Sequence, residues 1–253
     1  MNSFERTLIQ KTGYDHGWEV VVEDTPERVV LASALHKAQA YITEPLPGAG
    51  WILTLRPSRL LRELERVEWD HLLTDEYFGA DNEAELSVLL GQAARFARAL
   101  PDAPEVRFTL AVKKELSATT ITGTEVERLI RQRIGQDIYR ESLKDYWEGA
   151  CAVTGIAVPG LLRASHAKGW AECTTDAERL NVFNGFLLAA HLDALFDRHL
   201  MTFNDNGEAV FAPAIDDALR SKLGLAGLLK LRWISPEHLP FLNWHRTAFS
   251  KAA

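Results

Sequence analysis

Residues 149–212 decide the fold of the second half of the chain and read GACAVTGIAVPGLLRASHAKGWAECTTDAERLNVFNGFLLAAHLDALFDRHLMTFNDNGEAVFA. The segment CAVTG ends in a turn, and VPGLLRASHAK predicts a turn followed by a short strand. The Asn184-Gly185 dipeptide precedes LLAAHLDALFDR, in which the apolar residues have helical spacing. Further on, Asn206-Gly207 stands between LMTF and AVF and predicts a β-hairpin.

The polar residues of this stretch follow one order, with His166 on a short strand, Asn184 before a helix, and His191 and Asp193 inside that helix. This order resembles HNH endonucleases, and more narrowly the restriction-type HNH subfamily, which shares a CavTG turn, an A-x-H-x-x-x-W segment, an NG-x-x-L segment and a terminal FD. The corresponding segments are Cys151–Gly155, Ala164–Trp170, Asn184–Leu188 and Phe196–Asp197. The resemblance spans residues 128–250 and implies a ββα-metal nuclease domain.

Two flanking segments extend the resemblance. Upstream, GQDIYRESL resembles the Gln and Arg that precede the module in the family, here Gln136 and Arg140. Downstream, LNWHRTAF resembles the family's closing His-Arg pair, here His245 and Arg246. We expect DNA contacts from four residues, with helix packing as the alternative for the last two: Arg140, Lys168, His245 and Arg246.

The resemblance implies a role for each residue of the motif. His166 would be the general base, and Asn184 would hold the loop and the His166 imidazole in a productive orientation. One divalent metal ion, Mg²⁺ or Mn²⁺, would bind at Asp193 and His191. Phosphodiester hydrolysis needs a deprotonated water and positive charge on the developing phosphate, and histidine, with a pKa of about 6.5, suits the first task at neutral pH.

The sequence departs from the family pattern at the metal site. Ser165 stands where many family members have an Asp or His ligand, and His191 precedes Asp193 in the reverse of a common order. Residues two apart on a helix point about 200° apart, so either one of the pair lies in an irregular first turn or only one is a ligand. Asp193 ranks first because it lies nine residues after Asn184, which is the usual spacing.

The rest of the chain predicts an α+β fold in two parts, with residues 1–117 as an N-terminal α+β domain and 118–253 as the nuclease domain. Residues 116–123, LSATTITG, are the candidate linker, and a long helix follows over 124–147. Helices are expected from Ser58 and from Asn82. Strands are expected in 18–24, 27–35 and 106–112, with two more in 40–57.

The long helix has an apolar side and a basic side. We expect six residues on its buried side: Leu129, Ile130, Ile134, Ile138, Leu143 and Tyr146. The opposite side carries Arg128, Arg131, Arg133, Arg140 and Lys144. These cations form either an ordinary solvated helix face or an edge that follows a phosphate backbone.

Composition excludes several classes of protein. The 253 residues include 28 Lys+Arg and 35 Asp+Glu, so the net charge of −7 does not suit a strongly basic nucleic-acid protein. Residues 1–117 contain 13 basic and 19 acidic residues, which gives −6, and the remainder contains 15 and 16, which gives −1. No apolar run is long enough to span a membrane. Two cysteines cannot make a disulfide framework, and we expect a reduced, cytoplasmic protein.

These observations predict a metal-dependent endonuclease that hydrolyses double-stranded DNA, including DNA with modified bases, in a restriction or host-defence role. The resemblance implies 5′-phosphate and 3′-hydroxyl ends. The N-terminal domain would supply target recognition, with aromatic residues as stacking surfaces: Tyr14, Trp18, Trp51, Trp69, Tyr77 and Phe78. The alternatives are an N-terminal sensor or oligomerisation domain that gates the nuclease, and a non-catalytic DNA-binding protein with a degenerate module. A homodimer is expected, because one module cuts one strand.

Overall fold

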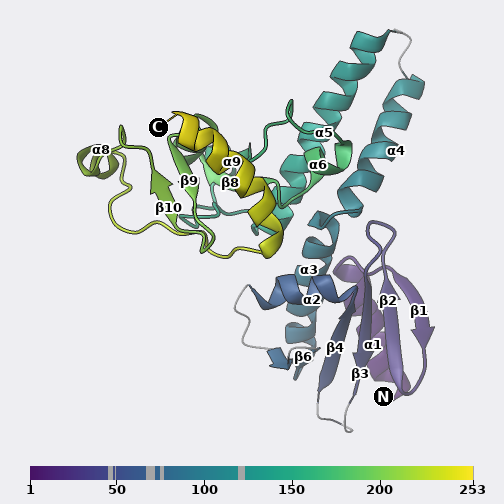
Figure 1. The fold of residues 1–253 in the computed structure, drawn as a ribbon. Coiled ribbons are helices and arrows are strands. Elements are labelled where there is room, and N and C mark those ends of the chain that lie inside the picture. Colours follow the sequence, from purple (N-terminus) through teal and green to yellow (C-terminus); the bar gives the residue numbers. More distant parts are fainter. Residues whose placement is uncertain (45–47, 49, 67–71, 75–76, 119–122, 253) are drawn as a thin grey trace. The chain divides into compact units, whose positions relative to one another are not determined.

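A computed structural model describes residues 1–44, 48, 50–66, 72–74, 77–118 and 123–252 (Figure 1). The chain divides into two compact units, Met1–Ala103 and Pro104–Ala253. The division therefore lies before Pro104 rather than after residue 117. Among the described residues, no helix is both long and apolar enough to cross a membrane.

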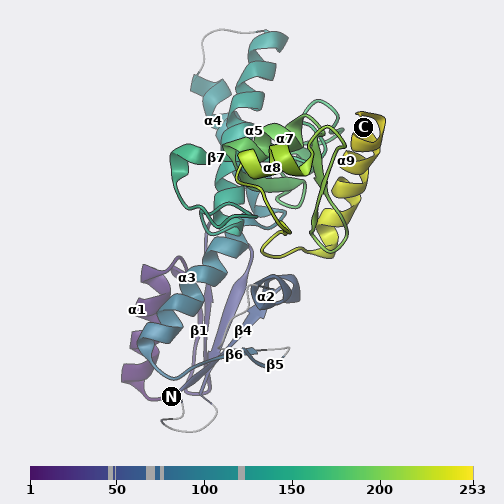
Figure 2. The same cartoon turned by 90° about the vertical axis from the view of Figure 1, so that its left-hand side faces the viewer.

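The N-terminal unit is built around a six-stranded antiparallel sheet in the order β1-β2-β3-β4-β6-β5. The strands are β1 (Val20–Asp24), β2 (Arg28–Ala32), β3 (Gln39–Thr43), β4 (Trp51–Arg56), β5 (Leu72–Thr74) and β6 (Tyr77–Ala80). The helices are α1 (Ser3–Asp15), α2 (Ser58–Glu65) and α3 (Glu83–Ala99). Helices α1 and α3 pack against each other, α1 contacts β2, and α2 contacts β4 (Figure 2).

The β-branched runs form the four long strands as predicted, and the helices expected from Ser58 and Asn82 are also confirmed. Asn82 caps α3 by accepting a hydrogen bond from the Glu85 backbone nitrogen at 3.0 Å. The unit's core includes Trp18, whose indole nitrogen donates to the Leu90 carbonyl at 2.8 Å. Trp69, one of the aromatic residues considered for base stacking, lies outside the described residues.

The strand predicted over 106–112 is wrong, because these residues belong to helix α4 (Ala103–Ala118). The alternating apolar residues fit a strand, but of these four only Phe108 and Val112, four residues apart, are buried in the helix. Val106 and Leu110 are 47% and 63% exposed. Helix α3 ends at Ala99, before Pro101 and Pro104, and helix α4 then begins at Ala103.

The C-terminal unit begins with α4, which is antiparallel to α5 (Thr124–Tyr146), as their partners Arg107–Ser142 and Glu115–Arg133 show (Figure 1). The strands that follow are β7 (Leu162–His166), β8 (Gly185–Ala189), β9 (Met201–Phe203) and β10 (Ala209–Phe211). The helices are α6 (Asp176–Leu180), α7 (Ala190–Asp197), α8 (Asp217–Lys222) and α9 (Leu239–Ala252), with short 3₁₀ turns at Pro159–Leu161 and Pro236–His238.

Two antiparallel hairpins organise this unit. Strands β9 and β10 pair across the Asn206-Gly207 turn, as the sequence predicts. Strands β7 and β8 pair from Leu162↔Ala189 to His166↔Gly185, and α7 follows β8 directly, so β7, β8 and α7 make a ββα arrangement. The predicted helical run began too early, because Leu188 belongs to strand β8.

Candidate active site

His166 ends strand β7 opposite Gly185 of β8, and three residues fix its imidazole ring. One face stacks on the Tyr139 ring of α5, with centroids 3.7 Å apart and planes 17° apart. The Trp170 ring approaches edge-on at 5.9 Å. His166 Nε2 lies 2.9 Å from the Arg179 carbonyl oxygen. A carbonyl only accepts, so Nε2 carries the hydrogen and the neutral ring keeps its lone pair on Nδ1.

Burial sets the protonation state of this ring. Desolvation lowers the pKa of His166 to about 4, against smaller opposing effects of the Arg179 carbonyl and the Asp197 carboxylate. The imidazole is therefore neutral at pH 7 and able to accept a proton. Asp197, which ends α7, stabilises the charged form of the ring through its negative charge.

Asn184 is fully buried and ties together the loop that follows His166. Its Oδ1 accepts from the Lys168 backbone nitrogen at 2.8 Å, and its Nδ2 donates to the carbonyls of Lys168 and Glu178, both at 3.1 Å. The same nitrogen lies 3.3 Å from Cys173 Sγ. Asn184 thus holds the loop directly. It acts on the imidazole through the Glu178–Arg179 backbone, whose Arg179 carbonyl accepts the bond from His166.

Gly185 is required by the close packing of this hairpin. A Cβ at this position would lie 1.9 Å from the Ser165 carbonyl oxygen and 2.3 Å from the Tyr139 hydroxyl. Its φ of +156° is also a conformation that side-chain-bearing residues rarely adopt. No separate role was expected for Gly185 from the sequence, so this requirement was not predicted.

Asp193 and His191 are separated by the helix. Both lie within the regular part of α7, which begins at Ala190, so they point to different sides. Asp193 is half-buried, and the Ser165 hydroxyl donates to its Oδ1 at 2.5 Å. His191 is exposed and, among the described residues, has no hydrogen bond or ion pair. The structure therefore brings Asp193, but not His191, to the strand that carries His166.

The available donors suit a hard ion that keeps most of its water. Asp193 provides a carboxylate and Ser165 a hydroxyl, and the described ranges contain no group of three or more His, Cys, Asp and Glu side chains that could hold a metal ion. Structural zinc needs a full shell of nitrogen and sulfur ligands. Mg²⁺ is commonly held by one or two carboxylates together with waters and phosphate oxygens, and Mn²⁺ accepts similar ligands. These residues therefore fit Mg²⁺ or Mn²⁺.

The four residues expected to contact DNA differ in availability. Arg140 is exposed and lacks an ion pair or hydrogen bond within the part of the chain that the structure describes. The Lys168 ammonium is held by both carboxylate oxygens of Glu178, at 2.9 and 3.1 Å, and this bond contributes most to lowering the Glu178 pKa to about 2. Arg246 binds the Phe203 carbonyl and the Asp205 carboxylate, so it closes the β9–β10 hairpin.

His245 corrects the expectation of a phosphate contact, because it is 1% exposed. Its ring stacks on Phe196 at 3.9 Å, and its nitrogens lie 2.9 Å from the Phe196 carbonyl and 2.9 Å from the Thr202 hydroxyl. Desolvation lowers its pKa to about 4. His245 therefore packs α9 against α7 and β9, which was the alternative for this residue.

The basic side of α5 is largely paired. Four of its five cations make ion pairs with nearby acids: Arg128–Glu125, Arg131–Asp176, Arg133–Glu115 and Lys144–Glu141. Pairing of this kind is what a solvated helix face shows. The exception in the described chain is Arg140, one residue from the Tyr139 ring that stacks on His166. Only Arg140 of this set thus keeps its charge available for a phosphate.

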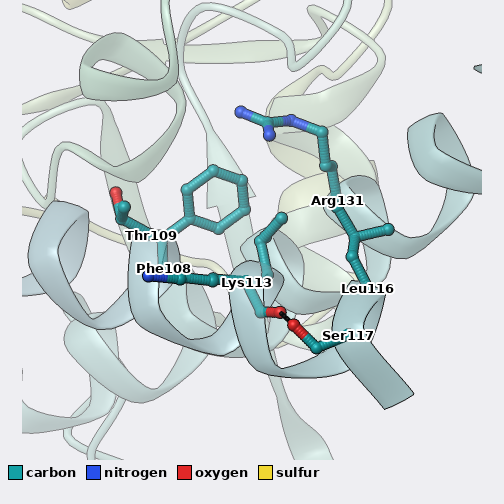
Figure 3. A pocket seen from close by; sticks show the side chains of 7 residues that line it. Phe108, Thr109, Lys113, Leu116, Ser117 and Arg131 are labelled. Atoms are coloured by element: carbon teal, nitrogen blue, oxygen red, sulfur yellow. Dashed lines mark hydrogen bonds between the residues drawn. The ribbon is translucent and has the colours of Figure 1, made fainter. Parts of the chain in front are cut away.

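A separate groove of about 500 Å³ lies between α4 and α5 (Figure 3). Its lining residues are Phe108, Thr109, Val112, Lys113, Leu116, Ser117 and Arg131. The Arg131 guanidinium lies 5.3 Å from the Phe108 ring centroid and is paired with Asp176. None of the predicted site residues lines this groove, so it is distinct from the site around His166.

Desolvation of three histidines should make the fold sensitive to mild acid. Burial lowers the pKa values of His36, His166 and His245 from 6.5 to about 4. The unfolded chain therefore binds more protons than the folded chain between pH 6.5 and 4, so the free energy of unfolding should fall as the pH drops through this window. Each histidine contributes at most about 1.4 kcal/mol per pH unit.

Urea unfolding measured between pH 7 and pH 5 checks this expectation. A His36→Gln variant serves as the control, because it removes one of the three groups and should reduce the slope by about a third. A stability that stays constant between pH 7 and pH 5 would contradict the assignment of these histidines as neutral in the folded chain.

Comparison with known families adds one match. Residues 151–204 match the HNH endonuclease family, and the rest of the chain matches no family. No curated protein matches the chain. The matched segment contains His166, Asn184, His191 and Asp193, but it leaves out Arg140 upstream and the His245-Arg246 pair downstream. The resemblance found in the sequence is thus confirmed for its central part, since residues 151–204 are similar to HNH endonucleases.

Proposed function

We propose that this protein is a metal-dependent endonuclease that hydrolyses phosphodiester bonds in DNA. The observation that carries the proposal is the orientation of His166, whose Nε2–H is bound by the Arg179 carbonyl at 2.9 Å. This bond leaves Nδ1 as the basic nitrogen of a neutral ring. A non-catalytic, degenerate module would not need a neutral histidine held in one tautomer.

In the proposed reaction, His166 Nδ1 takes a proton from a water molecule as that water attacks phosphorus. The Arg179 carbonyl and the Asp197 charge then stabilise the imidazolium that forms. Asp193, with Ser165, would hold the divalent ion, which supplies positive charge to the phosphate and to the leaving oxygen. Loss of the 3′ oxygen as the leaving group gives 5′-phosphate and 3′-hydroxyl ends. Asn184 keeps the surrounding loop in place throughout.

The two candidate ligands on α7 should respond differently to substitution. Asp193→Ala removes the carboxylate bound to Ser165, so the Mg²⁺ or Mn²⁺ concentration needed for half-maximal cleavage should rise by at least about tenfold. His191→Ala should change this concentration by less than about threefold, because His191 is exposed and lies on another side of the helix. Metal titrations of both variants provide the measurement. The reverse ranking would make His191 the main ligand.

We propose a restriction or host-defence role in the cytoplasm, with double-stranded DNA, modified or not, as the substrate. For the N-terminal unit, two of the aromatic residues considered for base stacking, Trp18 and Phe78, are buried in the core. Tyr14 is 68% exposed. The buried aromatics and the charge of −6 over residues 1–117 favour a unit that gates the nuclease over one that reads DNA broadly. Digestion of modified and unmodified phage DNA separates the two roles, because cleavage should depend on the modification only if the N-terminal unit recognises DNA.

We also propose that the active form is a homodimer, because one HNH segment provides one site and a duplex has two antiparallel strands. Light scattering of the free protein at micromolar concentration should give twice the chain mass of 28.3 kDa. A monomer mass, together with nicked plasmid as the final product, would contradict this proposal.

A further inference from the structure

Tyr139 lies on α5, outside residues 151–204, yet it makes the closest ring contact of His166. Its side chain is 1% exposed. Its ring is nearly parallel to the imidazole, at 17°, with centroids 3.7 Å apart. The sequence placed Ile138 on the buried side of this helix, whereas the structure buries Tyr139 together with Gly135, Ser142, Leu143 and Tyr146.

The Tyr139 hydroxyl bridges the two strands beside the catalytic histidine. It donates to the Asn184 carbonyl at 2.9 Å and lies 3.4 Å from the Ser165 carbonyl. Ser165 and Asn184 immediately precede His166 and Gly185, which are paired across the hairpin. A Cβ on Gly185 would be 2.3 Å from this hydroxyl, so the missing side chain leaves room for it.

The contacts of Tyr139 complete the restraints on the imidazole. The bond from Nε2 to the Arg179 carbonyl fixes one atom of the ring but still permits the ring to rotate about that contact. The stacked Tyr139 ring fixes the plane of the imidazole, and the Trp170 ring packs against one of its edges. Together they fix the direction of Nδ1, the atom that must reach the attacking water. A misplacement of about 1 Å in such a group can cost about 100-fold in rate.

We propose that Tyr139 is a positioning residue of the active site, which holds the His166 imidazole in place by ring stacking and anchors the β7–β8 hairpin through its hydroxyl. This inference rests on the proposed endonuclease function. It also assigns a task to helix α5, which the HNH match does not include. The helix supplies one wall of the site.

Three full-length variants separate positioning from packing. Tyr139→Leu removes the ring, and kcat on plasmid DNA at saturating metal should fall by about 100-fold while KM stays within about threefold. Tyr139→Phe keeps the ring and loses the hydroxyl, so kcat should fall by only about fivefold, the equivalent of one ordinary hydrogen bond. Tyr146→Leu is the matched control, because Tyr146 is equally buried on α5 but packs on Trp147, Phe183 and Trp233.

A spectroscopic measurement reads the ring directly. Nitrogen NMR of the histidine side chains should show the Nε2–H tautomer for His166 in the wild type, in Tyr139→Phe and in Tyr146→Leu. Tyr139→Leu should show averaging between tautomers. A merely structural role would not change the tautomer in Tyr139→Leu alone.

The outcomes are distinguishable from failure of the proposed function. If the wild type cleaves DNA and Tyr139→Leu loses no more kcat than Tyr146→Leu, the positioning role is overturned and the endonuclease stands. A loss of about 100-fold in Tyr139→Phe, which keeps the ring, would assign the effect to the hydroxyl and overturn the stacking role; this result needs only Tyr139→Phe to fold. If the wild type cleaves nothing with any metal, the function itself fails, and the positioning role of Tyr139 fails with it.

Discussion

Replacing His166 by alanine is expected to lower the rate of DNA cleavage by about 10²–10⁴-fold, the usual cost of losing a general base. The variant should still bind DNA and fold, because the substitution leaves Asn184 and its loop contacts in place. Single-turnover cleavage of plasmid DNA at saturating Mg²⁺ or Mn²⁺ provides the measurement. Circular dichroism and a gel-shift titration report folding and binding.

A second histidine provides the control for this experiment. His199 lies just after α7, has a φ of +55° and contacts His245 rather than His166. His199→Asn, with a residue that tolerates this backbone conformation, should cleave at close to the wild-type rate. If His166→Ala also cut at that rate, the general base would have to be sought elsewhere.

Gly185→Ala is expected to have the largest effect on stability in the C-terminal unit. The added Cβ would lie 1.9 Å from the Ser165 carbonyl oxygen, which is far inside van der Waals contact, so strands β7 and β8 would have to separate. Overpacking and a strained backbone together should cost about 4 kcal/mol. Urea unfolding of the variant measures the loss.

Gly160 provides the matched control for this substitution. A Cβ there would have no atom within 4 Å, so Gly160→Ala should change the free energy of unfolding by less than about 0.5 kcal/mol. Equal stability of Gly185→Ala and Gly160→Ala would show that the hairpin does not pack as closely as described.

Local patterns predicted most of the secondary structure. Runs such as ERVVLASAL predict strands directly, because β-branched residues between turns favour strands. VRFTLAV alternates as a strand does, yet of its alternating apolar residues only Phe108 and Val112 are buried, and their spacing of four residues is that of one face of a helix. A period of two does not exclude a helix when half of the apolar residues can remain exposed.

The motif pointed to His166, Asn184 and Asp193, which the structure brings to neighbouring elements, but it did not predict what each one contacts. The sequence noted Ser165 only as a departure from the family, whereas the structure gives it the hydrogen bond to Asp193. Tyr139 was not predicted to be buried, because the sequence pattern placed the neighbouring Ile138 on the buried side of the helix instead. The available signal for a buried Tyr139 was its spacing of four residues from Gly135, which places both on one face of α5. Gly135 leaves room for the Trp170 ring, which contacts the His166 ring edge-on.

Charged residues were the hardest to interpret from the sequence. Lys168 and Arg246 have the residue type that contacts phosphate, but Glu178 and Asp205 neutralise them within the fold. These partners lie ten and 41 residues away along the chain, and no local pattern connects them. Arg140 keeps the predicted availability because no acid in the described structure pairs with it.

Digestion of supercoiled plasmid by the purified full-length protein, with Mg²⁺, with Mn²⁺ and with EDTA, tests the central claim most directly. Wild-type protein should convert the plasmid to nicked or linear form with either metal and leave it intact with EDTA, and His166→Ala should leave it intact in all three conditions. Cleavage that persists in EDTA, or that survives in His166→Ala at the wild-type rate, would contradict a metal-dependent nuclease centred on His166. Intact plasmid in every lane of the wild-type protein, under conditions in which it binds DNA, would favour the non-catalytic alternative.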